Sequence, residues 1–112
     1  MIMDLLMAAA LAGPAAYRPP DPLWYEQAVA CAASALVEKG RQEPTGDQFG
    51  EMMTWGMIMA ETGRRLGRTK EQVDSGDLRA AEPFYRHLKQ KKKPAFAAHR
   101  AYCRALLDAD RP

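Results

Sequence analysis

Two cysteines, Cys31 and Cys103, are the residues of this chain whose type and placement point most clearly to chemistry. Each lies on or beside the apolar stripe of an expected helix, the first and the last of the folded region. First and last helices of a small bundle are often neighbours, so the sequence predicts a disulfide between them. The enclosed loop is long, for which the chain-entropy account gives about 4 kcal/mol of stabilisation. Two unrelated buried thiols are the alternative, and no Cys-x-x-Cys motif indicates thiol exchange.

Other residues that bind metals or catalyse reactions occur in less specific patterns. Thioether sulfur is a ligand for Cu(I), and four methionines crowd the second expected helix: Met52, Met53, Met57 and Met59. Methionines at helical spacing more often fill a core. The two histidines, His87 and His99, belong to no metal-spaced motif, and the sequence places no serine or carboxylate beside them for a catalytic triad. The pattern therefore favours a protein that is not an enzyme and needs no cofactor.

Basic residues concentrate near the C-terminus, with seven Lys or Arg and no acid between Arg86 and Arg104. The candidates for binding an anion are Arg86, Lys89, Lys91, Lys92 and Lys93. Such a cluster can bind an acidic protein, an anionic envelope component or a phosphate polymer, or it can simply be a solvated face. The net charge of +2 is too small to indicate a nucleic-acid binder. Residues 69–74 are also too short to form a DNA-reading helix.

Residues 1–16 have the pattern of a secretory signal peptide. Eight apolar residues run from Leu5 to Ala12, and Gly13 and Ala15 are small enough for cleavage after Ala15. Asp4 stands where such a segment normally carries Lys or Arg, so a first helix packed on the core is the alternative. Cleavage predicts a periplasmic or secreted protein, in a compartment where disulfides persist, and the alternative location is the cytoplasm. No apolar run is long enough for a transmembrane span.

Helical periodicity predicts one all-α domain over residues 23–110, after an extended proline-rich lead over residues 17–22. Helices are expected over residues 23–39, about 45–66, 77–88 and 94–109. Asp21 is suited to cap the first of them, with Pro22 at the first helical position, and Gly40 to end it. A Thr69–Gln72 capping box starts a short helical piece that breaks at Ser75 and Gly76, after which Asp77 caps the next helix. Pro83 kinks or restarts that helix. The second helix is expected to be the most buried, and its small residues Gly56, Ala60 and Gly63 would admit a close neighbour.

Length and composition agree with this organisation. The 112 residues leave room for one domain, and 47% hydrophobic with 27% charged residues is typical of a folded protein. We therefore expect a small bundle of about four helices, closed by Cys31–Cys103, with a binding or structural role outside the cytoplasm. A second copy of the chain could pack on the second helix. The alternatives are a cytosolic nucleic-acid-associated regulator that uses residues 86–104, and a periplasmic Cu(I) binder that uses the four methionines.

Overall fold

The computed structural model describes residues 21–109, which are almost entirely helical. The elements are α2 (Pro22–Lys39), α3 (Gly46–Arg65), the π-helical stretch η2 (Gln72–Leu78), α4 (Arg79–Lys91) and α5 (Lys93–Ala109). Within this range there is no strand, and none of its helices is long and apolar enough to cross a bilayer. The predicted all-α bundle is therefore confirmed. The expected signal peptide and residues 17–20 of the lead lie outside the described residues.

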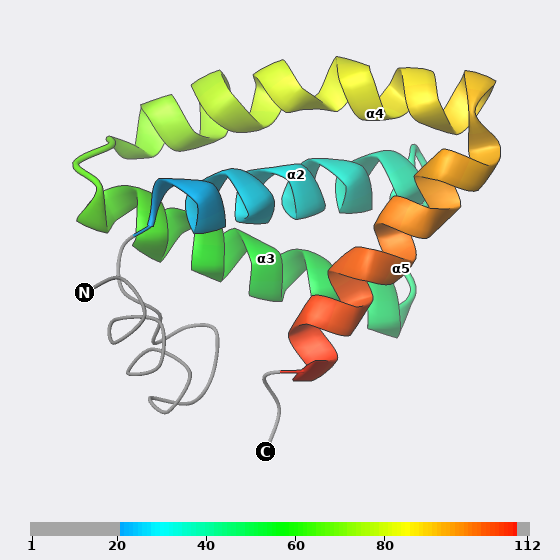
Figure 1. Ribbon diagram of the computed structural model, residues 1–112, viewed down its shortest axis with the longest axis horizontal. Coiled ribbons are helices and arrows are strands. Elements are labelled where there is room, and N and C mark those ends of the chain that lie inside the picture. The colour runs from blue at the N-terminus through cyan, green and yellow to red at the C-terminus, as the bar shows by residue number, and fades with distance from the viewer. Residues whose placement is uncertain (1–20, 110–112) are drawn as a thin grey trace, which may run out of the picture.

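Helix α2 occupies the centre of the bundle. Figure 1 shows it lying between α4 and α3, with α5 turning back from the end of α4 across α2. Ten residues of α2 are buried, against five of α3, so the expectation that the second helix is the most buried was wrong. The physical reason is the run of small side chains on α2, which lets neighbours approach it from several sides. These residues are Ala28, Ala32, Ala33, Ser34 and Ala35.

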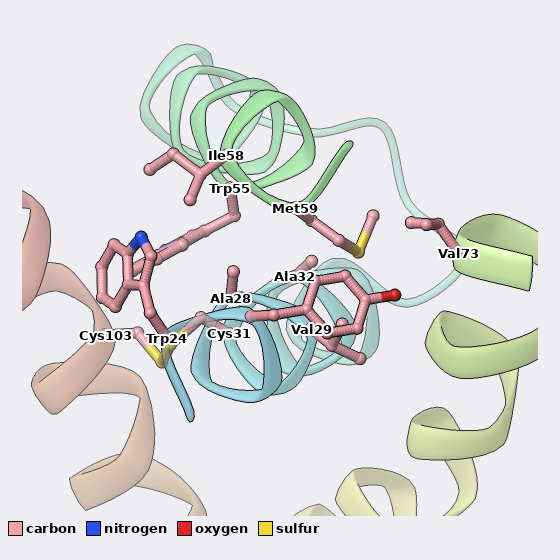
Figure 2. Close-up of a cluster of buried hydrophobic side chains, with 11 residues drawn as sticks. Trp24, Ala28, Val29, Cys31, Ala32, Trp55, Ile58, Met59, Val73 and Cys103 are labelled. Atoms are coloured by element: carbon pink, nitrogen blue, oxygen red, sulfur yellow. A yellow bond between two sulfur atoms is a disulfide. The ribbon is translucent and has the colours of Figure 1, made fainter. Parts of the chain in front are cut away.

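The hydrophobic core forms where α2 meets α3 and η2. The ring centroids of Trp24 and Trp55 lie 5.8 Å apart in a tilted arrangement, and Met59 and Val73 complete this cluster (Figure 2). Burial of these apolar surfaces is the main force that holds the three elements together.

The boundaries of α2 follow from local chemistry. The Asp21 side chain accepts a hydrogen bond of 2.9 Å from the Leu23 backbone N–H, and Pro22 takes the first helical position. Pro22, the last residue of the expected extended lead, is thus helical. The helix ends at Gly40, which adopts a φ of 63° that residues with a Cβ rarely reach. Both the cap and the stop were predicted from the sequence.

Two capping boxes start the next helical segments. The predicted box is confirmed: the Thr69 N–H donates to Gln72 Oε1 at 2.8 Å, and the Gln72 N–H donates to Thr69 Oγ1 at 3.1 Å. The same reciprocal pair, formed by Thr45 and Gln48, starts α3. Each box satisfies backbone N–H groups that have no partner within the helix.

The break expected at Ser75 and Gly76 is absent, and that prediction was wrong. The chain stays helical over residues 70–91, first in the wider π-helical turns of η2 and then in α4. A glycine inside a helix costs about 1 kcal/mol, and packing of Leu78 against the core offsets this cost. Asp77 does not cap α4, and Pro83 lies inside α4 without starting a new helix.

Of the small residues on α3, only Gly63 is needed for close packing. A Cβ built on Gly63 would lie 2.8 Å from Val73 Cγ2 and 2.9 Å from Tyr25 Cε1. A Cβ on Gly56 would meet no heavy atom within 4 Å, and Ala60 is exposed. The close approach expected at all three positions therefore occurs at Gly63 alone.

We expect Gly63→Ala to lower the free energy of unfolding by about 1–3 kcal/mol, because the new methyl group overlaps two side chains. The matched control Gly56→Ala should raise it by up to about 1 kcal/mol, because alanine is the better helix former. Urea denaturation of both variants measures the difference. Similar effects for the two substitutions would contradict this account.

Candidate functional site

A groove of about 760 Å³ runs between α2 and α4. Its volume lies within the range of small-molecule sites in proteins. Tyr25 and Val29 line it from α2, and Phe84 and Tyr85 line it from α4. Phe84 is 60% exposed, although its ring packs edge-on against Tyr85 with centroids 5.0 Å apart. The groove thus offers aromatic surface to solvent in a concave setting.

A charged cluster lines one part of this groove, and we call it the Tyr25–Asp77–Arg68 triad. The Tyr25 hydroxyl donates to Asp77 Oδ2 at 2.6 Å. Arg68 makes a bidentate contact with the same carboxylate. Its Nε lies 2.6 Å from Oδ2, and its Nη2 donates to Oδ1 at 3.0 Å. The positive φ of Gly67, 82°, turns the chain after α3 so that Arg68 points back toward η2. Helix α2, the loop after α3 and the stretch η2 therefore each supply one member of the triad.

The electrostatics of the triad keep the phenol of Tyr25 protonated. Burial, and then the hydrogen bond to Asp77 and the charge of that carboxylate, raise the pKa of Tyr25 to about 12. At neutral pH Tyr25 is thus a hydrogen-bond donor, and Asp77 is an acceptor already occupied by two partners. The hydroxyl proton of Tyr25 and both carboxylate oxygens of Asp77 are therefore already engaged within the triad.

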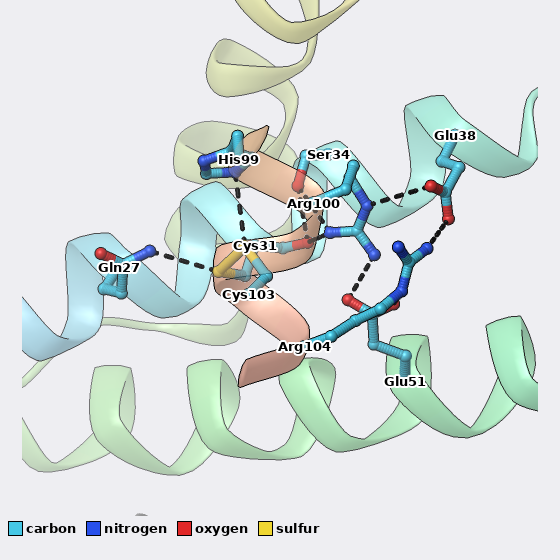
Figure 3. The surroundings of a disulfide bond; sticks show 9 residues. All are labelled: Gln27, Cys31, Ser34, Glu38, Glu51, His99, Arg100, Cys103 and Arg104. Atoms are coloured by element: carbon cyan, nitrogen blue, oxygen red, sulfur yellow. Dashed lines mark hydrogen bonds and ion pairs between the residues drawn. A yellow bond between two sulfur atoms is a disulfide. The ribbon is translucent and has the colours of Figure 1, made fainter. Parts of the chain in front are cut away.

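The disulfide between Cys31 and Cys103 joins the middle of α2 to α5, as predicted. The two Cα atoms lie 5.6 Å apart, and both cysteines are fully buried. Polar groups surround the sulfur atoms (Figure 3): Gln27 Nε2 lies 3.2 Å from Cys31 Sγ, and His99 Nε2 lies 3.4 Å from Cys103 Sγ. Such a bond is compatible with a location outside the reducing cytoplasm.

His99 is held in place from two sides. Its ring stacks on Tyr85, with centroids 4.7 Å apart, so it connects the groove to the disulfide. Burial lowers the pKa of His99 below its usual range, and the nearby charge of Arg100 adds to this effect. The imidazole is therefore neutral at pH 7.

A buried guanidinium lies beside the disulfide. Arg100 on α5 is 1% exposed, and its Nη1 donates to Ser34 Oγ at 2.9 Å and to the Cys31 carbonyl at 3.5 Å. Its Nη2 forms an ion pair with Glu51 of α3, whose side chain is 8% exposed. Its Nε lies 3.6 Å from Glu38 of α2. One side chain on α5 thus contacts both neighbouring helices.

Arg104 completes this group, which we call the Arg100 network (Figure 3). Its Nη2 lies 2.5 Å from Glu38 Oε1, and its Nε lies 3.5 Å from Glu51 Oε1. Two arginines therefore face two glutamates, and the formal charges cancel. Buried charges are tolerated only when they are paired in this way.

The five basic candidates for anion binding differ in whether their side chains have partners within the protein. Lys89 Nζ donates to the Val37 carbonyl at 3.0 Å, where it caps the C-terminal end of α2. Arg86 pairs with Glu82 at 3.2 Å within α4. Lys91, Lys92 and Lys93 are exposed at the junction of α4 and α5, and they form no ion pair within residues 21–109. Of the five candidates, Lys89 and Arg86 thus have partners within the described residues, and these three lysines remain as the exposed charges.

The four methionines of α3 differ in their burial and their surroundings. Met59 belongs to the core, and Met52 is half-buried. Met53 and Met57 are 51% and 68% exposed. Met52, Met53 and Met59 border a smaller hollow of about 270 Å³, which Met57 does not line. The methionines thus fill different roles along α3, and copper binding stays an untested prediction.

The sequence did not point to the residues that form the two charged groups. Asp77 was expected to be a helix cap, Arg68 to belong to a basic group at the end of the second helix, and Glu51 was not considered. One available signal was the spacing of Arg100, which lies between Phe96 and Cys103 on the inward face of α5. No protein-family model, curated protein or solved structure matches the chain.

We expect Arg100→Ala to lower the free energy of unfolding by about 3–5 kcal/mol, because Glu51 then keeps a buried charge without its main partner. Arg64→Ala is the control, since Arg64 pairs with Glu61 at the exposed surface of α3 and its loss should not change stability measurably. Guanidinium denaturation of both variants tests this. Equal stability of Arg100→Ala and the parent protein would contradict the role of the network.

Proposed function

We propose that this chain is an exported, periplasmic or secreted, binding protein whose ligand occupies the groove between α2 and α4. One observation carries the proposal: the exposed Phe84, at 60%, and the Tyr25–Asp77–Arg68 triad line the same groove. An exposed aromatic side chain together with a few fixed polar groups is typical of a small-molecule site.

The lining of the groove favours an aromatic ligand. The exposed Phe84 and the partly buried Tyr85 offer ring surface for stacking, whereas Tyr25 and Val29 are 6% and 7% exposed and add little apolar area. The charged groups of the lining are Glu26, Asp77 and Arg68, which sum to one net negative charge. A neutral or singly cationic aromatic molecule fits this balance better than an anion, and a cation also gains from the ring faces.

Export is supported by three independent features. Residues 1–16 have the composition of a signal peptide, apart from the acid at Asp4. The disulfide ties the first described helix to the last. The domain is small, and small exported domains often depend on a disulfide for their stability.

We expect Phe84→Ala to weaken binding of a cationic aromatic probe, thioflavin T, by about tenfold, which corresponds to the loss of roughly 1.4 kcal/mol of ring contact. Phe49→Ala is the matched control, because Phe49 is similarly exposed, at 53%, but lies on α3 outside the groove. Fluorescence titration measures both affinities.

The anionic probe ANS provides the second arm of this experiment. It should bind the parent protein more weakly than thioflavin T, because the groove carries net negative charge. A loss of affinity in Phe49→Ala but not in Phe84→Ala would move the site to α3 and overturn the proposal.

Export predicts a shortened, oxidised chain. We expect the intact mass of protein expressed from its start codon in a Gram-negative host to lack residues 1–15. Alkylation without reductant should add nothing, because both thiols are bonded. A full-length mass with two alkylated cysteines would contradict export and would favour the cytosolic alternative.

A further inference from the structure

We propose that Cys31, His99 and Cys103 form a second site in the reduced protein, which binds a divalent metal ion of the zinc class. This site is distinct from the groove and does not depend on the proposed ligand. The metal and the disulfide exclude each other, because the same two sulfur atoms serve both.

The geometry of the three residues carries the proposal. Their ligand atoms, two sulfurs and one imidazole nitrogen, all lie within 4.8 Å of one another. In a tetrahedral zinc site, bonds of about 2.3 Å to sulfur and about 2.0 Å to nitrogen place neighbouring ligand atoms about 3.5–3.8 Å apart. Cys103 Sγ and His99 Nε2 are already 3.4 Å apart. The two bonded sulfurs must separate to reach this spacing, and rotation of the cysteine side chains moves them apart.

The helices supply the spacing that such a site needs. His99 and Cys103 are four residues apart on α5, so both lie on the face turned toward α2. Gln27 and Cys31 repeat this spacing on α2, and the Gln27 amide already donates toward Cys31 Sγ at 3.2 Å. Three protein ligands leave a fourth position for water, and the Gln27 amide can donate to a bound thiolate (Figure 3).

The Arg100 network keeps these ligands together when the disulfide is open. Arg100 precedes Cys103 by one turn and binds Ser34 and the Cys31 carbonyl without involving either sulfur. Its ion pair with Glu51 adds a connection to α3. Because these contacts are independent of the sulfur oxidation state, α5 remains docked on α2 after reduction.

One dithiol molecule is sufficient to reduce the disulfide before the metal binds. A dithiol transfers two electrons and two protons to the Cys31–Cys103 bond, which gives two thiols while the dithiol becomes a disulfide itself. Metal binding then displaces the two thiol protons to solvent, and His99 binds through its neutral nitrogen. A disulfide of a second molecule reverses this step: it accepts two electrons from the two thiolates and two protons from solvent, becomes two thiols, and the re-formed Cys31–Cys103 bond releases the metal ion.

Cobalt titration of the purified protein tests the site. The protein is reduced with dithiothreitol, freed of reductant under nitrogen and titrated with Co²⁺, and far-UV circular dichroism of the same sample monitors its fold. We expect one Co²⁺ per chain, with thiolate-to-cobalt absorption and the visible bands of a tetrahedral site. The oxidised protein should show neither. Zn²⁺ should displace the cobalt and slow alkylation of both thiols.

Two histidine variants make the test specific. His99→Gln should weaken cobalt binding by about tenfold or more, since one ligand is lost. His87→Gln is the matched control, because His87 is exposed on α4 and should leave the affinity unchanged. Absence of thiolate-to-cobalt absorption, whether the reduced chain is folded or not, overturns the proposal. Equal affinities of the two variants overturn it as well.

Discussion

The position of α5 depends on the burial of one charge, that of Arg100. A guanidinium that is 1% exposed must find partners for its charge, and here they come from two helices: Ser34 and Glu38 on α2, and Glu51 on α3. Few placements of α5 satisfy all of them at once, so the network selects one docking geometry more than it adds net stability. That geometry brings Cys103, one turn further along, opposite Cys31. The disulfide then locks an arrangement that the ion pairs have selected.

The docking of α5 on α2 also connects the disulfide to the groove. His99, the neighbour of Arg100 in the chain, contacts the disulfide on one side and Tyr85 on the other. Tyr85 in turn lines the groove between α2 and α4. Opening of the disulfide and binding of a ligand in the groove would therefore both act on the environment of one imidazole ring. The oxidation state of the cysteine pair and occupancy of the groove are coupled through that stack if either moves the ring.

Local features of the sequence were sufficient to predict most helix ends, whereas features that depend on packing were not. Asp21, Gly40 and the Thr69–Gln72 box act within one turn of chain, so their roles could be read directly. The continuous helix through Gly76 could not be predicted in this way, because packing against residues distant in the sequence outweighs the low helix propensity of glycine. The central place of α2 was missed for a similar reason: a helix of small residues buried on several sides shows little amphipathic contrast. The roles of the charged groups were the hardest to predict. Sequence alone indicates a surface position for Arg100 and Asp77, because partners such as Ser34 and Tyr25 are distant in the sequence.

The disulfide also changes the connectivity of the domain. Cys31 and Cys103 are separated by 72 positions, and α3, η2 and α4 all lie within the covalent ring that their bond closes. A protease that cuts the loop between α2 and α3 therefore leaves two pieces still joined to each other. A force applied between the start of α2 and the end of α5 passes directly through the sulfur atoms and bypasses those three elements. The groove wall formed by α4 is thus mechanically shielded for as long as the bond is intact.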